Sequence, residues 1–201
     1  MNTASPSQPQ RAVCVYCASS SSAHPEYREA AFRLGAALAT AGLGIIYGGG
    51  ARGSMGALAD GALAKGGHVV GILPKFMAEL EWGHPRLTEL QLVEDMRIRK
   101  HLMLTHSQAA IALPGGSGTL EELLEAITLK RLGLYLNPIL LLNTRGFFTP
   151  LIQVFTRAIE ERFMDERHAA MWEVVDQPEQ VLEALNRARA WSADARSFAA
   201  L

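Results

Sequence analysis

The chain has 201 residues, of which 49% are hydrophobic and 19% are charged, and its formal net charge is −1. This composition is typical of one globular domain with a core of its own, and it excludes a chain that is disordered throughout. The near-neutral charge gives no general attraction to nucleic acid or to a membrane surface, and no hydrophobic run reaches the roughly 20 residues of a membrane helix.

Both ends of the chain are expected to lie outside the domain. Residues 1–10 are rich in Ser, Pro and Gln and lack the hydrophobic segment of a signal peptide, which predicts a disordered tail. We expect the domain to span residues 11–190 and a second tail to span residues 191–201. The presence of only two cysteines, together with the lack of an export signal, indicates a cytoplasmic protein.

Strands and helices are predicted to alternate along the domain. Hydrophobic runs predict strands at 11–18, 45–47, 68–73, 89–93, 109–113, 138–142 and 172–175. Helical spacing and helix-start signals predict helices at 25–41, 55–65, 95–107, 148–163 and 178–190, and one more after Gly118. This alternation predicts one doubly wound, Rossmann-like α/β domain with a mainly parallel sheet flanked by helices. Residues 74–88 are the longest irregular segment, of a kind that often lines a site.

Cys14 and Cys17 match the Cys-x-x-Cys spacing of redox proteins. In those proteins the motif opens a helix, whose dipole lowers the pKa of the thiol. Here both residues lie in a strand-like run, and residues three apart on a strand face opposite sides of the sheet. We therefore expect two buried structural cysteines.

The glycine-rich turn at residues 48–54 contains the Gly-x-Gly-x-x-Gly pattern of dinucleotide-binding proteins. However, it follows the second predicted strand rather than the first, and no acidic residue stands about 20 positions further on. NAD binding is therefore disfavoured. Contact with a nucleotide and simple tight packing of a helix on the sheet both stay open.

A second glycine-rich turn, at residues 114–122, has the sequence Pro-Gly-Gly-Ser-Gly-Thr-Leu-Glu-Glu and lies between a predicted strand and a predicted helix. Its glycines let a ligand approach the backbone, and the helix directs N–H groups and the positive end of its dipole into the turn. The turn lacks the lysine of a P-loop and the Gly-x-Ser-x-Gly of an esterase. It therefore predicts an anion site with an acid, Glu122, beside it.

Two roles for Glu122 stay open from the residues alone. Thr119 and Glu122 match a capping box, in which the glutamate bonds the first backbone N–H of the helix; alternatively, Glu122 is a catalytic acid. Cations at 97, 99 and 100 lie near the start of the preceding helix, where they oppose its dipole. They indicate an anionic ligand or a carboxylate partner, or else an exposed basic helix. No Cys or His spacing indicates a metal site.

Together, these motifs resemble those of the LONELY GUY (LOG) family of cytokinin riboside 5′-monophosphate phosphoribohydrolases, many of which were once labelled lysine decarboxylases. The resemblance runs from about residue 13 to residue 163, and the segments that carry it are 13–20, 47–50, 53–56, 99–100 and 114–122. Three positions depart from the usual pattern, namely Ala18 in place of Gly, Ser54 in place of Leu, and Leu129 in place of Trp.

The resemblance implies hydrolysis of the N-glycosidic bond of adenosine 5′-monophosphates, N6-modified or not, into a free cytokinin or adenine and ribose 5-phosphate. It implies that Arg99 and Glu122 are catalytic, with Glu122 facing the positive charge that develops on the ribose. The substrate-binding residues that it implies are Ser19, Gly49, Gly50, Met96, Lys100, Pro114, Gly115, Gly116, Ser117, Gly118 and Thr119. It implies a homodimer whose subunits build the site together, and no metal or other cofactor.

Two other functions are weighed against this one. The first is a module that binds or senses nucleotides without turnover, for which the acid would be unnecessary. The second is lysine decarboxylation, which uses pyridoxal phosphate on a Schiff-base lysine, and no lysine here stands in a recognisable setting for it. The choice between adenine and a prenylated adenine is expected to depend on residues 74–88 and 129–135.

Overall fold

The computed structural model describes residues 11–79, 83–189 and 191–199, so the expected tail at residues 1–10 lies outside the described part. One seven-stranded sheet has the order β4-β3-β2-β1-β5-β6-β7, and its neighbouring strands run parallel. The strands are β1 (Ala12–Tyr16), β2 (Gly44–Tyr47), β3 (Val69–Pro74), β4 (Glu89–Val93), β5 (Ala110–Ala112), β6 (Ile139–Leu142) and β7 (Glu173–Val175). The predicted doubly wound α/β fold is confirmed, and the strand order reverses between β1 and β5.

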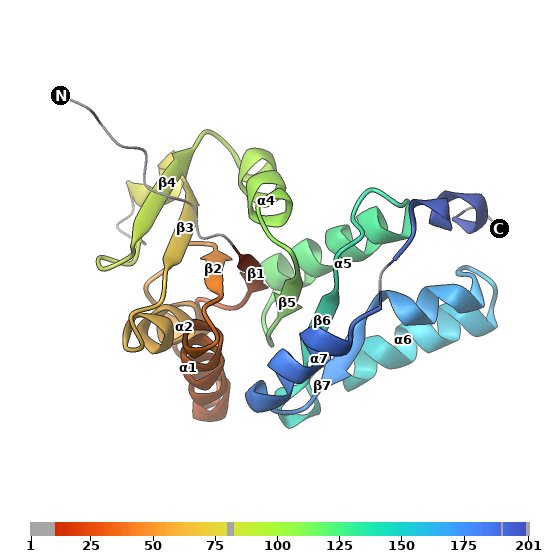
Figure 1. The fold of residues 1–201 in the computed structure, drawn as a ribbon, viewed down its shortest axis with the longest axis horizontal. Coiled ribbons are helices and arrows are strands. Elements are labelled where there is room, and N and C mark those ends of the chain that lie inside the picture. Colours follow the sequence, from red (N-terminus) through yellow and green to blue (C-terminus); the bar gives the residue numbers. More distant parts are fainter. Residues whose placement is uncertain (1–10, 80–82, 190, 200–201) are drawn as a thin grey trace.

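Helices cover both faces of the sheet (Figure 1). One face carries α1 (Pro25–Thr40), α2 (Gly53–Leu63) and α7 (Val181–Arg187), and the other carries α4 (Met96–Thr105), α5 (Ser117–Arg131) and α6 (Thr149–Glu160). Shorter helices are α3 (Lys75–Ala78), η1 (Thr144–Gly146), η2 (Glu166–Met171), η3 (Pro178–Gln180) and η4 (Ala193–Phe198). The arrangement gives three layers, with the sheet in the middle.

Two predicted segments differ from the structure. Residues 74–88, expected to be irregular, begin with the short helix α3. The helix expected at 178–190 is divided into η3 and α7, and it ends at Arg187 because Ala188 has an extended ψ of 129°. The N-cap predicted at Asp95 is confirmed, since its carboxylate accepts a hydrogen bond from the Ile98 backbone N–H over 2.8 Å.

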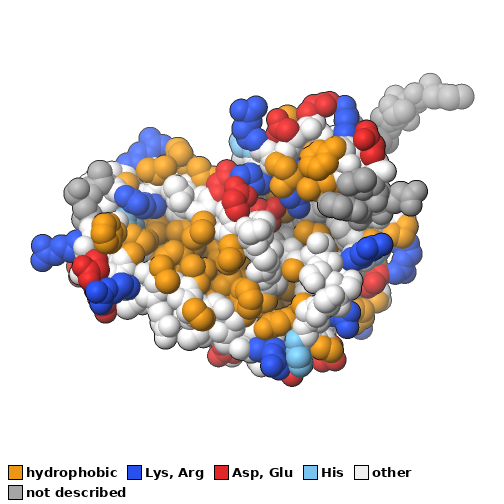
Figure 2. All heavy atoms as spheres, turned by 180° about the vertical axis from the view of Figure 1, so that it is seen from behind, with side chains coloured by type: hydrophobic (Ala, Val, Ile, Leu, Met, Phe, Trp, Pro, Cys, Tyr) orange, Lys and Arg blue, Asp and Glu red, His pale blue; other side chains and the backbone are white. Residues whose placement is uncertain are grey.

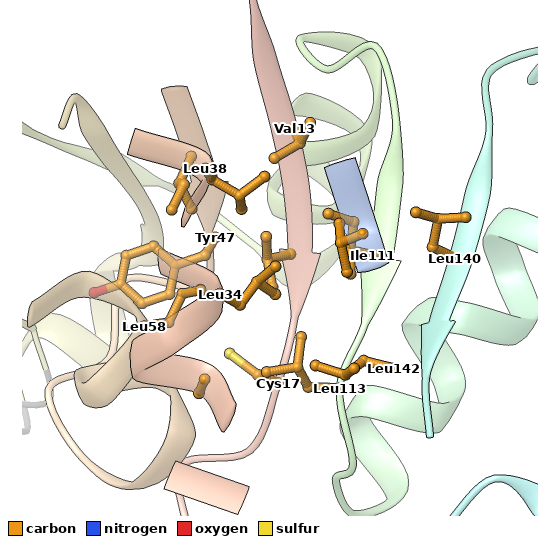
Figure 3. Packing of buried hydrophobic residues seen from close by; sticks show 14 of the residues in the cluster. Val13, Cys17, Leu34, Leu38, Tyr47, Leu58, Ile111, Leu113, Leu140 and Leu142 are labelled. Carbon is orange, nitrogen blue, oxygen red and sulfur yellow. The ribbon is translucent and has the colours of Figure 1, made fainter. Parts of the chain in front are cut away.

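Hydrophobic side chains fill the space between the sheet and each helical layer. In the layer of α1 and α2, the fully buried Leu34, Leu38 and Leu58 pack against the sheet, on which Val13 and Ile111 are buried (Figure 3). Continuous apolar strands such as β6 suit this position, because a central strand is covered on both faces.

Cys14 and Cys17 are both buried and unpaired, and they belong to different core clusters. Cys17 packs on the side of α1 and α2, whereas Cys14 packs on the side of α4 and α5, as the strand alternation predicts. Burial raises the pKa of both thiols far above the ordinary value. The prediction of structural cysteines is confirmed.

Helices α1 and α2 approach each other where glycines replace larger side chains. A Cβ added to Gly35 would lie 2.1 Å from the Leu58 carbonyl oxygen, and one added to Gly61 would lie 2.1 Å from the Phe32 carbonyl oxygen. Both neighbours are backbone atoms, which cannot move without moving a helix. Close packing of these helices therefore depends on the two glycines.

We expect Gly61→Ala to lower the free energy of unfolding by about 1–3 kcal/mol, because the added methyl group overpacks the α1–α2 contact. Urea unfolding measures this change. Gly83→Ala is the control, since its added carbon would make only ordinary contacts of 3.5 and 3.7 Å with leucine side chains. Equal stability of Gly61→Ala and the wild type would contradict this account of the contact.

Candidate functional site

Three turns meet at the carboxyl ends of β1, β2 and β5, where the strand order reverses. Ligands of doubly wound sheets bind at such a point. The turn after β1 contacts the turn after β2, because a Cβ on Gly53 would lie only 2.6 Å from the Ser19 carbonyl carbon. The turn after β5 follows the strand that pairs with β1 on its other side. The structure therefore brings the predicted residues of the 19, 48–54 and 114–119 regions to one edge.

Backbone contacts hold the turn after β2. Gly49 has a φ of +77°, in the left-handed region that favours glycine. Its carbonyl accepts a hydrogen bond from the His84 backbone N–H over 2.8 Å, and the Tyr47 hydroxyl donates to the Gly50 carbonyl over 3.0 Å. Gly50 also forms an antiparallel bridge with Gly83. The segment after residue 82 therefore lies directly against this turn.

The capping-box interpretation of Thr119 and Glu122 is wrong. Helix α5 has its N-cap at Gly116, three residues earlier than a capping box at Thr119 requires, and no side chain caps it. Thr119 and Glu122 therefore lie inside the helix, where both are buried. The carboxylate of Glu122 bonds to a side chain on another helix rather than to the start of its own.

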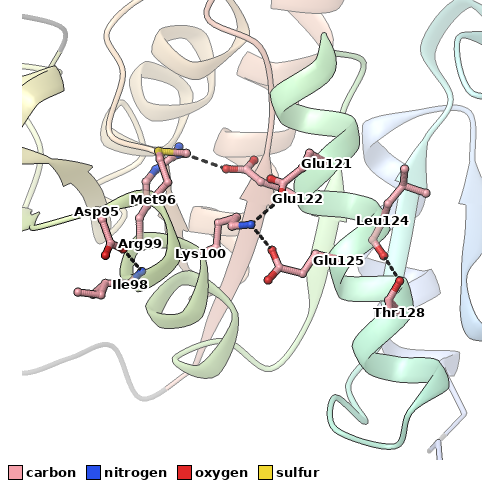
Figure 4. Close-up of polar contacts among 10 residues, drawn as sticks. All are labelled: Asp95, Met96, Ile98, Arg99, Lys100, Glu121, Glu122, Leu124, Glu125 and Thr128. Atoms are coloured by element: carbon pink, nitrogen blue, oxygen red, sulfur yellow. Dashed lines mark hydrogen bonds and ion pairs between the residues drawn. The ribbon is translucent and has the colours of Figure 1, made fainter.

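That partner is Arg99 on α4. The Arg99 Nη1 lies 3.0 Å from the Glu122 Oε1, and both side chains are about 95% buried, with exposures of 6% and 5%. The Arg99 Nε donates to the carbonyl of Ile72, within β3, over 3.1 Å, and Nη1 lies 3.7 Å from the Met96 Sδ. Figure 4 shows Arg99 and Glu122 reaching toward each other between α4 and α5.

Burial raises the pKa of Glu122 above its ordinary value of 4.5, and the Arg99 charge acts against this effect without cancelling it. Both charges lose hydration in the interior, so an ion pair of this kind contributes little net stability, although removing one partner is costly. Perturbed acids of this sort concentrate at functional sites. The pair is therefore the strongest candidate for a reactive centre in the described part of the chain.

Lys100, the neighbour of Arg99, also joins the two helices. Its Nζ lies 2.5 Å from the Glu121 Oε1 and 2.6 Å from the Glu125 Oε2, both on α5 (Figure 4). The expectation of carboxylate partners for the cations of this helix is confirmed for Arg99 and Lys100. Arg97 also has a carboxylate nearby, since its Nη2 lies 3.8 Å from the Asp95 Oδ2, but its side chain is 89% exposed.

The start of α5 is open to a ligand. Gly116, Ser117 and Gly118 are exposed, and a Cβ added to either glycine would meet nothing within 4 Å. The first backbone N–H groups of a helix have no partner within it, and they favour an anion. Gly115 instead leaves room for the Thr119 side chain, because an added Cβ would lie 2.2 Å from the Thr119 Oγ1. Glu122 lies about 7 Å further along the helix axis from this open end.

Two functional contacts could not be found from the sequence. The pairing of Lys100 with Glu121 and Glu125 joins residues more than 20 positions apart, and the only local signal was the unfavourable charge at the start of the helix. The carbonyl of Ile72, which holds Arg99, carried no signal, because every residue has a carbonyl group. Only the approach of α4 to β3 and α5 reveals both contacts.

The described residues contain no group of three or more His, Cys, Asp and Glu side chains placed to hold a metal ion. Among the helices in the described part of the chain, none combines the length and the hydrophobicity needed to cross a membrane.

Sequence comparison identifies several relatives. A family model described as "Possible lysine decarboxylase" matches residues 55–185. Cytokinin riboside 5′-monophosphate phosphoribohydrolase LOG3 of Arabidopsis thaliana is 42% identical over 154 residues, which are 77% of this chain and 72% of that protein. A probable phosphoribohydrolase of the same description from Oryza sativa subsp. japonica, LOG4, is 37% identical over 182 residues, 90% of this chain and 79% of that protein.

Structural comparison agrees with the fold. The X-ray structure of the protein TM1055 superposes with a TM-score of 0.71 at 26% identity and covers 89% of this chain and 99% of that one. The molybdenum cofactor carrier protein of Chlamydomonas reinhardtii has a TM-score of 0.70 over 88% of this chain and 96% of its own, but at 21% identity it shows the fold alone. Because the family model spans more than half of the chain and close relatives cover three quarters of it, the chain belongs to the LONELY GUY (LOG) family.

Proposed function

We propose that this chain hydrolyses the N-glycosidic bond of cytokinin riboside 5′-monophosphates and related adenosine 5′-monophosphates, releasing the free base and ribose 5-phosphate. The observation that carries the proposal is the buried pair of Arg99 and Glu122 beside the open start of α5. The names of the relatives, which describe phosphoribohydrolases acting on cytokinin riboside 5′-monophosphates, support the same reaction.

The open start of α5 is proposed to bind the 5′-phosphate. Gly116, Ser117 and Gly118 present exposed backbone there, and the helix dipole favours the negative charge. Pro114 and Gly115 directly precede this open start, and the Thr119 side chain packs against Gly115. The walls of the substrate site are assigned to four further residues around the carboxyl edge of the sheet, namely Ser19, Gly49, Gly50 and Met96.

Glu122 is proposed to act at the ribose. As the bond between C1′ and the base nitrogen breaks, its electron pair leaves with the base, which takes up a proton, and C1′ develops positive charge. A carboxylate facing C1′ stabilises that charge or orients the water whose oxygen adds to C1′ and which gives up a proton. Arg99 holds the carboxylate in place and is proposed to assist the leaving base or to hold the substrate.

Lys100 is proposed to contact the substrate as well, but two neighbouring carboxylates compete with the substrate for its ammonium group. Its ammonium group already has two carboxylate partners, Glu121 and Glu125. A direct bond to phosphate would require at least one of these contacts to lengthen. Even without such a bond, Lys100 keeps α4 and α5 together and so supports the alignment of Arg99 with Glu122.

The family description "Possible lysine decarboxylase" does not fit the surroundings of Lys130, Lys100 or Lys75. Burial lowers the pKa of Lys130 to about 8, as a Schiff-base lysine would require, but its Nζ donates to the Asn137 carbonyl over 2.7 Å. It also lies near the far end of α5, about 20 Å along the helix axis from the open start. Lys100 is paired with two carboxylates, and Lys75 is paired with Glu94.

A module that binds nucleotides without turnover is the competing function. Such a module needs the open start of α5 but has no use for a buried acid whose pKa is raised. Incubating the pure protein with AMP and, separately, with a cytokinin riboside 5′-monophosphate, followed by chromatography for the free base, separates the two functions. Recovery of both nucleotides intact, together with measurable nucleotide binding, would favour the binding module.

We also propose that two copies of the chain form a homodimer. Figure 2 shows hydrophobic side chains gathered on one face of the molecule, over the region of α5 and α6. The exposed members on or beside these helices are Leu124, Leu132, Leu134, Leu136, Val154 and Phe163. Contiguous apolar patches of this kind mark protein interfaces. Because α5 also carries Glu122 and the open start, a partner on this face would lie near the proposed site.

We expect Glu122→Gln to reduce the release of adenine from AMP by at least about 100-fold, because the neutral amide cannot stabilise positive charge at C1′. The amide keeps the volume of the side chain and an acceptor for Arg99, so the protein should remain folded. Glu29→Gln, an exposed change on α1, is the control. Near-wild-type turnover by Glu122→Gln would contradict the catalytic role.

The rate should also depend on pH through Glu122. Its pKa is raised above 4.5 by burial, so the carboxylate forms only at higher pH than in a free glutamate. Activity should therefore be lost as the pH falls through a midpoint above 4.5, because protonated Glu122 carries no charge. Measuring kcat/KM against pH, with circular dichroism to confirm the fold, tests this. A constant rate down to pH 4.5 in a folded protein would contradict it.

Sedimentation tests the dimer. We expect the wild type to have twice the chain mass of 21.8 kDa, and Val154→Asp to have the mass of one chain, because a charge is placed on a side chain that is 62% exposed on the apolar face. Phe32→Asp, at an exposed position of α1 on the other helical layer, is the control. A wild type that sediments as one chain would contradict the proposed dimer.

A further inference from the structure

Gly48, directly after β2, lies against the guanidinium group of Arg99. A Cβ added to Gly48 would lie 1.9 Å from the Arg99 Nη2 and 3.1 Å from its Cζ, and also 3.1 Å from the Met55 Cε. The φ of Gly48 lies outside the left-handed region, unlike those of Gly49 and Gly53. The φ of Gly48 would therefore accept an alanine, and the main obstacle is the Arg99 guanidinium, since the Met55 Cε is the flexible end of a side chain and needs to move by only a few tenths of an ångström.

The guanidinium group cannot easily move aside. Its Nε donates to the Ile72 carbonyl over 3.1 Å, and its Nη1 lies 3.0 Å from the Glu122 Oε1. The group is planar and rigid, so its three nitrogen atoms move together. A displacement of Nη2 would therefore lengthen the bond to Ile72, the bond to Glu122, or both.

We propose that Gly48 is a positioning residue, whose missing side chain leaves the space that the Arg99 guanidinium occupies when it pairs with Glu122. The proposal rests on the proposed function, in which Arg99 and Glu122 act on the substrate. It gives Gly48 a role distinct from that of Gly49, whose left-handed φ shapes the turn itself. Gly48 acts only through Arg99.

The first experiment measures AMP hydrolysis by Gly48→Ala. A misplacement of about 1 Å in a catalytic group can reduce a rate by about 100-fold, and we expect a fall of this size in kcat with a smaller change in KM. Gly67→Ala is the matched control, because its added carbon would also overlap neighbours, the Ala39 Cβ at 2.5 Å and the Ala62 carbonyl oxygen at 2.9 Å, in the segment between α2 and β3 where no Arg99 atom is among its nearest neighbours. It should keep wild-type kcat.

The second experiment compares thermal unfolding in two backgrounds. In the wild type, Gly48→Ala should lower Tm, because it disturbs the bonds of a buried charge. In an Arg99→Ala/Glu122→Gln background the space is empty, and the same change should leave Tm unchanged or raise it, because alanine restricts the unfolded chain. Arg99→Met replaces Arg99→Ala if the alanine background does not fold. Gly67→Ala should lower Tm equally in both backgrounds.

An equal loss of Tm from Gly48→Ala in both backgrounds would overturn the proposal, since the effect would not pass through Arg99. So would a kcat within about threefold of the wild type, or a rise in KM without a fall in kcat, which would indicate direct contact of Gly48 with the substrate. Failure of the wild type to release base from AMP and from a cytokinin riboside 5′-monophosphate would instead refute the proposed function, and the Tm comparison would still decide whether Gly48 holds Arg99.

Discussion

A buried ion pair between Arg99 and Glu122 is the constraint on which the rest of this site depends. Two charges 3.0 Å apart and almost fully buried lose much of their hydration, and their mutual attraction does little more than offset that loss. The surrounding chain compensates in specific ways. The Ile72 carbonyl accepts from Arg99, the bare backbone of Gly48 leaves room for its guanidinium group, and Lys100 fastens α4 to α5. Each of these contacts aligns the pair rather than adding to a hydrophobic core.

The fold explains why these pieces can meet. In a parallel sheet every strand points its carboxyl end to the same edge, and ligands of doubly wound sheets bind where the strand order reverses, here between β1 and β5. The edge then offers two different surfaces. The exposed start of α5 attracts an anion, and the buried acid further along the same helix is suited to a developing cation. The ribose 5-phosphate part of a nucleotide always carries the negative charge of its phosphate. It carries positive charge at C1′ only while the bond to the base breaks.

Much of the fold follows from the sequence. Apolar runs separated by glycine-rich turns predict the sheet. Side chains of a strand alternate between its two faces, which predicts that Cys14 and Cys17 face opposite helical layers, as they do. The site is harder to predict. The capping-box pattern at Thr119 is a genuine local signal, but it cannot reveal that the helix already begins after Gly116. The partners of Arg99 and Lys100 depend on how α4 packs against α5. The residues alone left Glu122 between a helix cap and a catalytic acid, and the catalytic role proposed for Arg99 comes from resemblance to a family.

We propose that the chain keeps the Arg99–Glu122 pair for chemistry rather than for stability. The decisive measurement is the release of the free base from AMP and from a cytokinin riboside 5′-monophosphate by a folded Arg99→Met/Glu122→Leu protein. Apolar side chains of similar size can replace a buried ion pair without loss of stability, so the account predicts a protein that unfolds no more easily than the wild type and releases no free base. A folded double variant that still hydrolyses either nucleotide at close to the wild-type rate would contradict it.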